Sequence, residues 1–321
     1  MAQFDLPMEQ LRTYRSDAVE PPDFDRFWAD TLAQARTHDL DARFEPVATA
    51  LRTVETYDVE FSGFGGHRIK GWFTVPAGTS EPLPLVVEFI GYGGGRGLPH
   101  ERLTWASAGY AHFLMDTRGQ GGSWSTGDTP DPVGSGSATP GFLTRGITDR
   151  DDFYYRRVIT DGVRAVEAAR THPLADAART VVTGVSQGGA LTIAVGGLVP
   201  DLVATAPDVP FLCDLPRAAR ITDAPPYREI AVYLSTHRPE RERVFATLAY
   251  FDNVHFAARG RAPALFSTAL LDMTCPPSTV FAAFNAYGHH DKTIEVYDFN
   301  GHEGGGAHQE ALRLEWLPKY L

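Results

Sequence analysis

The pattern of hydrophobic and polar positions changes its period near residue 50. Before that point, Phe24, Phe27 and Trp28 recur at the spacing of one helix face, and Asp23 stands at the N-cap position. After it, "TYDVEFSGF" and "HRIKGWFTVP" alternate apolar and polar residues on either side of "GFGG". That pattern is typical of a β-hairpin. The sequence therefore predicts a helical N-terminal extension over residues 1–50, followed by strands.

Apolar runs then alternate with helical patterns. "LPLVVEFIGYGGG" and "YAHFLMDTRGQGG" predict strands that run into glycine-rich loops, and "TDGVRAVEAARTH" has the spacing of an amphipathic helix. A strand at Thr180–Thr183 and a helix from about Gln187 follow, and "APALFSTALLD" and "TIEVYDF" predict two late strands before a terminal helix. Strands that alternate with helices imply a mostly parallel sheet covered on both faces. Residues from about 209 to 260 interrupt this order and predict a helical insertion, broken at Pro225-Pro226.

Composition and charge narrow the classes of function. The 321 residues are 43% hydrophobic, enough for a large core, and the formal net charge of −11 disfavours nucleic acid and anionic membranes as partners. The two cysteines, Cys213 and Cys275, give no disulfide framework. We find neither a signal-peptide pattern at the start nor an apolar run near the ~20 residues that span a bilayer. A cytoplasmic location is the expectation.

One serine stands at a tight corner. Gly184-Val185-Ser186-Gln187-Gly188 fits the pattern G-x-S-x-G, with a predicted strand before it and a predicted helix after it. A nucleophile at such a corner projects from the end of the sheet, and the flanking glycines let strand and helix approach closely. The N-terminus of the following helix offers free N–H groups to a developing oxyanion. The alternative is a glycine-rich turn with an incidental serine.

A serine nucleophile needs a base and a group that orients the base. Asp272 follows an apolar strand, and His302 follows the last strand in a glycine-rich loop, which gives the chain order Ser, acid, His of α/β-hydrolases. Asp208 is the second-ranked acid. The loop Gly91–Gly95 follows a strong parallel strand, so the backbone N–H groups of Tyr92 and Gln187 are the predicted oxyanion donors. We find no zinc-ligand spacing and no dinucleotide fingerprint, so no metal and no cofactor are expected.

Long blocks of the chain resemble the carbohydrate esterase family 7 enzymes, the acetyl xylan esterase and cephalosporin C deacetylase group. The blocks that carry the resemblance run over nearly the whole chain and include "DFDRFW", "GYGGGRG", "MDTRGQGGS", "GVSQGGA", "DVPFLCD", "LLDMTCPPSTVFAAFNAY" and "NGHEGGG". Ile90 is a departure, because the family usually has a His-Gly-Tyr-like run there.

The resemblance implies a single α/β-hydrolase domain over residues 1–321 that removes acetyl groups from small sugars, xylo-oligosaccharides or cephalosporin C. It places Ser186, Asp272 and His302 on the triad. It also places the oxyanion donors on Tyr92 and Gln187, and it gives the "RGQG" block at residues 118–121 the task of bracing loops. Tyr92, Phe211 and Pro226 are the predicted substrate-binding residues. Homohexameric assembly is implied as well.

Two other functions remain open at this stage. The same fold and triad serve peptidases, which differ from esterases in the leaving group. A catalytically inactive hydrolase fold can also act as a binding protein, although such a protein need not keep all three triad groups.

Overall fold

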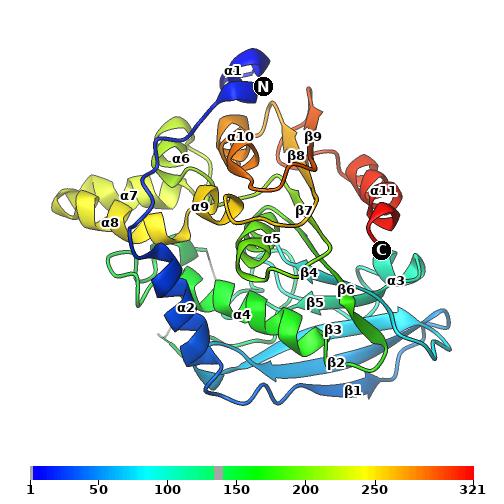
Figure 1. Ribbon diagram of the computed structural model, residues 1–321. Helices are drawn as coiled ribbons and strands as arrows, with labels where there is room; N and C mark the ends of the chain where they lie inside the picture. The colour runs from blue at the N-terminus through cyan, green and yellow to red at the C-terminus, as the bar shows by residue number, and fades with distance from the viewer. Residues whose placement is uncertain (1–2, 134–139) are drawn as a thin grey trace.

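The computed structural model describes residues 3–133 and 140–321, which form a nine-stranded sheet with helices on both faces (Figure 1). The sheet order is β1-β2-β3-β5-β4-β6-β7-β8-β9. The first three strands pair antiparallel with their neighbours, and the strands from β5 to β9 pair parallel. The bounds are β1 Arg43–Val47, β2 Val54–Ser62, β3 Arg68–Pro76, β4 Leu83–Phe89, β5 Ala111–Met115, β6 Ala175–Val185, β7 Ala204–Asp208, β8 Ala264–Ala269 and β9 Lys292–Tyr297. The prediction of a mostly parallel sheet flanked by helices is confirmed.

Alternation along the central strands divides the core between the two faces of the sheet. In β4, Leu85 and Val87 join the large apolar cluster on one face, whereas Val86 joins a smaller cluster on the other. The larger cluster is covered by α2 (Phe24–Ala35), α4 (Tyr154–Ala169), α5 (Gln187–Leu198), α9 (Asn253–Ala257) and α10 (Pro277–Ala286). The smaller one lies under α3 (Thr104–Ser107) and α11 (Ala307–Trp316), at the right of Figure 1. Parallel strands buried on both faces account for the continuous apolar runs in the sequence.

The N-terminal extension crosses the molecule from one end of the sheet to the other (Figure 1). The first helix, α1 (Met8–Thr13), contributes Leu11 to a cluster with Phe281 of α10, and α2 packs near α4. Asp23 stands at the N-cap of α2 as expected, but its carboxylate accepts a hydrogen bond from Tyr250 and pairs with Arg150 at 2.9 Å. Its side chain therefore ties α2 to the insertion. Residues 1–2 of the predicted extension lie outside the described residues.

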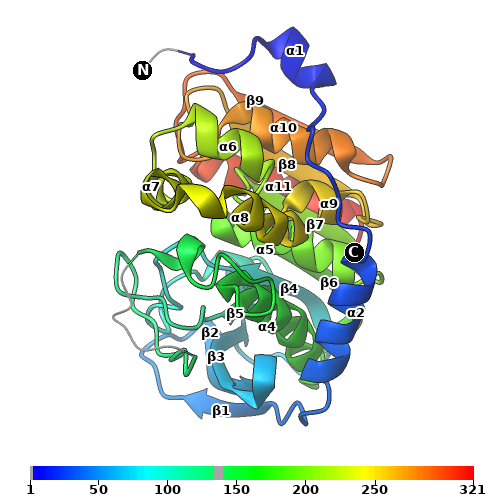
Figure 2. The ribbon, with the colours of Figure 1, turned by 90° about the vertical axis from the view of Figure 1, so that its left-hand side faces the viewer.

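The predicted helical insertion is present between β7 and β8. It contains α6 (Leu215–Ile221), α7 (Arg228–Thr236), α8 (Arg241–Leu248) and α9, with Pro225 and Pro226 between α6 and α7. Figure 2 shows α7 next to the green loop that precedes α4. Short 3-10 helices lie between the other elements or at the end of the chain, at Phe64–Gly66, Phe142–Thr144, Arg238–Glu240, Ala249–Phe251 and Leu317–Lys319. Within residues 3–133 and 140–321, every helix falls short of the length and apolar character needed to cross a membrane.

The predicted amphipathic helix is present as α4, but its polar stripe is buried. Arg157, Asp161 and Arg164 occupy its polar positions, yet they are only 4%, 1% and 4% exposed. Asp161 is paired with the buried Arg118, whose Nε lies 2.5 Å from the Asp161 carboxylate. The polar stripe of this helix therefore faces partners inside the protein, a situation that the periodicity of one helix does not distinguish from exposure to solvent.

Acid should destabilise the fold through His172, whose imidazole packs against the rings of Phe44, Tyr57 and Phe73. Burial lowers the pKa of His172 from 6.5 to about 4, so the unfolded chain takes up this proton first. Stability present above pH 6.5 is then lost as the pH falls toward 4. We expect the unfolding free energy of the protein, relative to His172→Leu, to fall by about 1 kcal/mol per pH unit in this window. Urea unfolding across the pH range measures it. The exposed His308→Leu is the control, and a difference that does not change with pH would contradict the prediction.

Candidate active site

The serine corner is built by close backbone packing. β6 ends at Val185 and α5 begins at Gln187, which leaves Ser186 between them with φ 59° and ψ −115°. A side chain at either flanking glycine has no room: a Cβ on Gly184 would lie 2.5 Å from the backbone of Gly188, and one on Gly188 would lie 2.2 Å from the carbonyl oxygen of Phe89. Strained backbone of this kind persists only where the surroundings hold it. The corner therefore has the geometry of a nucleophile elbow, as predicted.

Ser186, His302 and Asp272 lie in one hydrogen-bonded line. The Nε2 atom of His302 is 2.9 Å from the Ser186 Oγ, and its Nδ1 atom is 2.9 Å from Oδ2 of Asp272. Asp272 is fully buried, whereas the side chain of His302 remains 34% exposed. The structure thus brings together three residues that are far apart in the chain, in the arrangement in which an imidazole can accept a hydroxyl proton.

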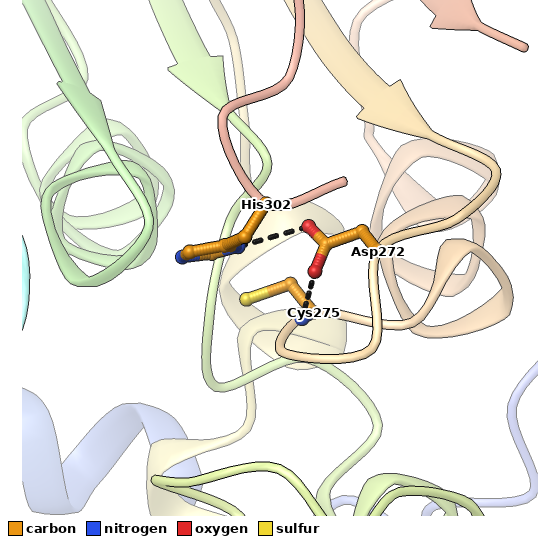
Figure 3. A group of neighbouring side chains, drawn as sticks. All are labelled: Asp272, Cys275 and His302. Atoms are coloured by element: carbon orange, nitrogen blue, oxygen red, sulfur yellow. Dashed lines mark hydrogen bonds and ion pairs between the residues drawn. The ribbon is translucent and has the colours of Figure 1, made fainter. Parts of the chain in front are cut away.

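Backbone groups hold the carboxylate in place. The other Asp272 oxygen accepts hydrogen bonds from the N–H groups of Thr274 and Cys275, at 2.8 and 2.9 Å. Figure 3 shows His302 and the Cys275 backbone approaching Asp272 from different sides. Burial raises the pKa of the Cys275 thiol well above 9.0, so this sulfur is a neutral neighbour of the triad and no thiolate nucleophile.

These residues also form a group that offers metal-ligand atoms. One ligand atom each from Asp272, Cys275 and His302 lies within 4.8 Å of the others. The Nδ1 atom of His302 and a carboxylate oxygen of Asp272 already bond to each other, and the thiol keeps its proton, whereas metal binding requires a thiolate. The donor set fits a triad better than a metal site, and the absence of a metal remains a prediction.

The second-ranked acid is engaged elsewhere. Asp208 accepts a hydrogen bond from Gln309 at 2.8 Å and pairs with Arg313 at 2.9 Å. Glu303, next to the histidine in sequence, accepts hydrogen bonds from Asn300 and from the N–H of Gly301. Asp208 therefore ties the end of β7 to α11, and Glu303 holds the loop that carries His302.

The oxyanion loop is clamped on both sides of its predicted donor. The side chain of Gln187 donates from Nε2 to the carbonyl of Ile90 at 3.2 Å, and the N–H of Gly93 donates to Oε1 of Gln120 at 2.7 Å. The two glutamines are joined at 2.9 Å, and Tyr155 donates its hydroxyl to Oε1 of Gln187 at 2.9 Å. The N–H of Tyr92 lies between these two fixed peptides, next to the start of α5. The expectation that the "RGQG" block braces the loops agrees with the position of Gln120.

The side chain of Tyr92 connects this loop to the insertion. Its hydroxyl donates to Oε1 of Glu229 on α7 at 2.6 Å and accepts from the N–H of Phe142 at 2.8 Å. Glu229 also accepts from the N–H groups of Gly141 and Leu143, at 3.1 and 3.0 Å. Burial, followed by the charge of Glu229, raises the pKa of Tyr92, so the hydroxyl keeps its proton and donates. The sequence reasoning named Pro226 in the segment "PPYREI" but missed Glu229.

A cavity of about 580 Å³ opens over the serine. Its wall includes Ser186 and His302 together with Tyr92 and Pro226. Two of the three predicted substrate-binding residues therefore lie in the same cavity as the serine and the histidine. Phe211 is fully buried, with its ring 6.2 Å from that of Tyr92 and 4.7 Å from that of Tyr227. It thus supports the wall from behind. Sequence reasoning missed three further residues of this wall, Trp124, Arg102 and Glu88, because they carry no catalytic motif.

A family model described as acetyl xylan esterase (AXE1) matches residues 1–320. The chain belongs to the acetyl xylan esterase family. Its structure is similar to that of the acetyl xylan esterase from Paenibacillus sp. R4, with 37% identity, a TM-score of 0.91 and coverage of 98% of this chain and 100% of that one. The likeness also identifies the architecture as an α/β-hydrolase fold.

Two further proteins are also similar to this chain. Acetyl xylan esterase 1 from Thermoanaerobacterium sp. JW/SL YS485 is 33% identical with a TM-score of 0.89, and the match covers 99% of this chain and all of that one. The acetyl esterase Axe7A of Xylanibacter ruminicola (strain ATCC 19189 / DSM 19721 / CIP 105475 / JCM 8958 / 23) is 28% identical over 287 residues, 86% of this chain. The match spans 62% of the length of Axe7A.

The clamp between Tyr92 and Glu229 should appear as a coupling free energy. A half-buried carboxylate that accepts a hydroxyl hydrogen bond contributes about 1.5–3 kcal/mol. We therefore expect the unfolding free energies of Tyr92→Phe, Glu229→Ala and the double variant to give a coupling of about 1–3 kcal/mol. Denaturant unfolding of the four proteins measures it. Tyr92→Phe with Glu240→Ala on the surface serves as the matched control cycle, and additivity in the Tyr92–Glu229 cycle would contradict the clamp.

Proposed function

We propose that this chain is a serine esterase that removes acetyl groups from small acetylated carbohydrates, such as xylo-oligosaccharides and sugar acetates, and from cephalosporin C. The observation that carries the proposal is the unbroken line from Asp272 through His302 to Ser186, at 2.9 Å for each hydrogen bond. Membership of the acetyl xylan esterase family supports acetate as the acyl group.

The reaction follows from this line in two steps. Ser186 Oγ attacks the acetyl carbonyl while His302 Nε2 takes its proton, and Asp272 stabilises the imidazolium that forms. The oxyanion accepts hydrogen bonds from the N–H groups of Tyr92 and Gln187. Collapse breaks the bond from the carbonyl carbon to the sugar oxygen, and His302 returns the proton to that oxygen. Water, activated by His302, then releases acetate from Ser186 and restores the hydroxyl.

The oligomeric state and the cellular location of the protein are also proposals, and both rest on the sequence alone. Homohexameric assembly rests on the resemblance of the sequence alone, and so does any restriction of the site to small substrates by neighbouring copies. A cytoplasmic location is likewise a prediction. Nucleic acid and membrane surfaces are not expected partners, given the net charge of −11.

Replacement of the triad should abolish turnover. We expect Ser186→Ala to remove p-nitrophenyl acetate hydrolysis, and Asp272→Asn to lower kcat by about 10⁴-fold, because the imidazole loses the partner that fixes its orientation. Steady-state kinetics measures both. Asp208→Asn is the matched acid control and should lower kcat far less than Asp272→Asn. Folding is checked by circular dichroism, and near-normal turnover of a folded Ser186→Ala protein would refute the proposal.

A substrate panel should separate the alternatives. We expect kcat/KM on acetylated xylose, acetylated xylobiose and cephalosporin C to exceed that on peptide anilides by orders of magnitude. The proposed esterase takes an acetyl group and an alkoxide leaving group, whereas a peptide anilide offers a peptidyl group and a poorer, anilide leaving group. A fluorophosphonate probe should label Ser186 alone, as mass spectrometry of the digested protein would show. Faster cleavage of the anilides would favour a peptidase, and a folded protein without labelling would favour an inactive binding protein.

A further inference from the structure

A large aromatic side chain stands half in the open beside the nucleophile. Trp124 is 56% exposed, although it lies in the wall of the cavity that holds Ser186 and His302. An indole left in water forgoes the favourable burial of a large apolar surface. Ligand pockets are lined mostly by apolar and aromatic side chains, so an exposed indole in the wall of this cavity is a candidate ligand contact.

The indole is fixed in place before any ligand binds. Its Nε1–H donates to the carbonyl of Tyr92 at 2.9 Å, and its ring lies on Gly94, where a Cβ would come within 2.3 Å of the ring atom Cζ2. The lack of a side chain at Gly94 therefore leaves the space that the ring occupies. A preorganised face binds a ligand with less loss of conformational entropy than a mobile side chain.

A pair of charged groups adjoins the ring. Arg102 donates to Glu88 at 2.7 Å, and its guanidinium carbon is 5.8 Å from the centre of a Trp124 ring. The Arg102 backbone has a φ of 52°, in the left-handed region, and its side chain remains 30% exposed in the cavity wall. Strained residues of this kind cluster at ligand sites. The Glu88 side chain is 12% exposed, and its second oxygen lies 3.0 Å from Nε2 of His112. Arg102 therefore presents N–H donors beside the apolar ring, and Glu88 can accept only through the remaining lone pairs of its oxygens.

The size of the cavity leaves room for more than an acyl group. An acetyl group occupies roughly 60 Å³, about the share of two water molecules in the liquid. The cavity of about 580 Å³ is several times larger. Most of it is therefore available to the leaving group, which is the part of the substrate that distinguishes one acetate ester from another.

We infer that Trp124 is the platform on which the pyranose ring of the leaving group stacks, with Arg102 and Glu88 bonding to its hydroxyls. The faces of a pyranose carry C–H groups and suit an indole, while its rim carries hydroxyls that both donate and accept. This inference rests on the proposed esterase function and assigns the residue that selects the leaving group. Trp124 takes no part in the proton transfers.

The test compares a sugar ester with an ester that has no ring. The substrates are methyl tri-O-acetyl-β-xylopyranoside and ethyl acetate, both followed by pH-stat, and the readout is the ratio of their kcat/KM values. We expect Trp124→Ala to lower this ratio roughly tenfold or more, the scale of a lost apolar contact in a binding pocket. Methyl β-xylopyranoside, as an inhibitor of ethyl acetate hydrolysis, should show a Ki raised by a similar factor.

Further variants separate stacking from positioning of the loop. Trp124→Phe keeps a ring but loses the N–H donor, so it should retain most of the ratio even if both rates fall. Trp124→Leu gives a second variant if the alanine protein fails to fold, and the partly exposed Phe4→Ala should change neither rate. Equal losses on both esters, or an unchanged Ki, in folded Trp124→Ala or Trp124→Leu would overturn the platform. A wild-type protein that hydrolyses neither ester would instead overturn the proposed function.

Discussion

The site depends on one close backbone contact, between the end of β4 and the start of α5. With the α-carbon of Gly188 against the carbonyl of Phe89, the first turn of α5 sits on the C-terminal end of the neighbouring strand. This contact holds Ser186 in its strained conformation and brings the loop after β4 beside the N-terminus of α5. One close contact therefore positions the predicted nucleophile and both predicted oxyanion donors, and a side chain at position 188 would prevent it.

Donors for an oxyanion are useful only if their direction is fixed before the reaction, because reorientation would consume the stabilisation they provide. Here the fixing is done by polar side chains from separate elements. Gln120, which follows β5, accepts from the N–H of Gly93, and Glu229 of α7 accepts from the Tyr92 hydroxyl. Tyr155 of α4 acts one step further away, because it donates to Gln187, whose side chain donates to the carbonyl of Ile90. Such a network is effective when each member is satisfied, since the low dielectric of the interior strengthens its bonds. Glu229 thus connects the insertion to the loop that carries the predicted oxyanion donor Tyr92.

Much of this arrangement could be predicted from the sequence, because short motifs and the positions of residues after predicted strands indicate it. The elbow has a motif with a strand and a helix on either side, and Asp272 and His302 follow strands in the expected order. The residues of the site that were not predicted have no such sequence motif. Glu229 and Trp124 act through contacts more than thirty residues away in the chain, with Tyr92 in both cases. The amphipathic pattern of α4 was predicted, but the burial of its charged stripe could not be, because helical periodicity reports that a face is polar and not whether its partner is water or protein.

The burial of a charged residue in α4 is explained by the loop that its partner, Arg118, belongs to. Arg118 is fully buried and makes two hydrogen bonds with Asp161 of α4, at 2.5 and 2.7 Å, while Asp161 also accepts from the N–H of Phe64. Apolar residues of similar volume often stabilise an interior as well as an ion pair does, so stability alone does not account for these charges. An apolar contact, however, does not fix the rotation of a loop about its own axis, whereas a two-pronged guanidinium–carboxylate pair does. The loop fixed in this way carries Gln120 two residues later and Trp124 six residues later. The ion pair between Arg118 and Asp161 of α4 therefore helps to position both Gln120, which bonds to the loop around Tyr92, and the exposed indole of Trp124.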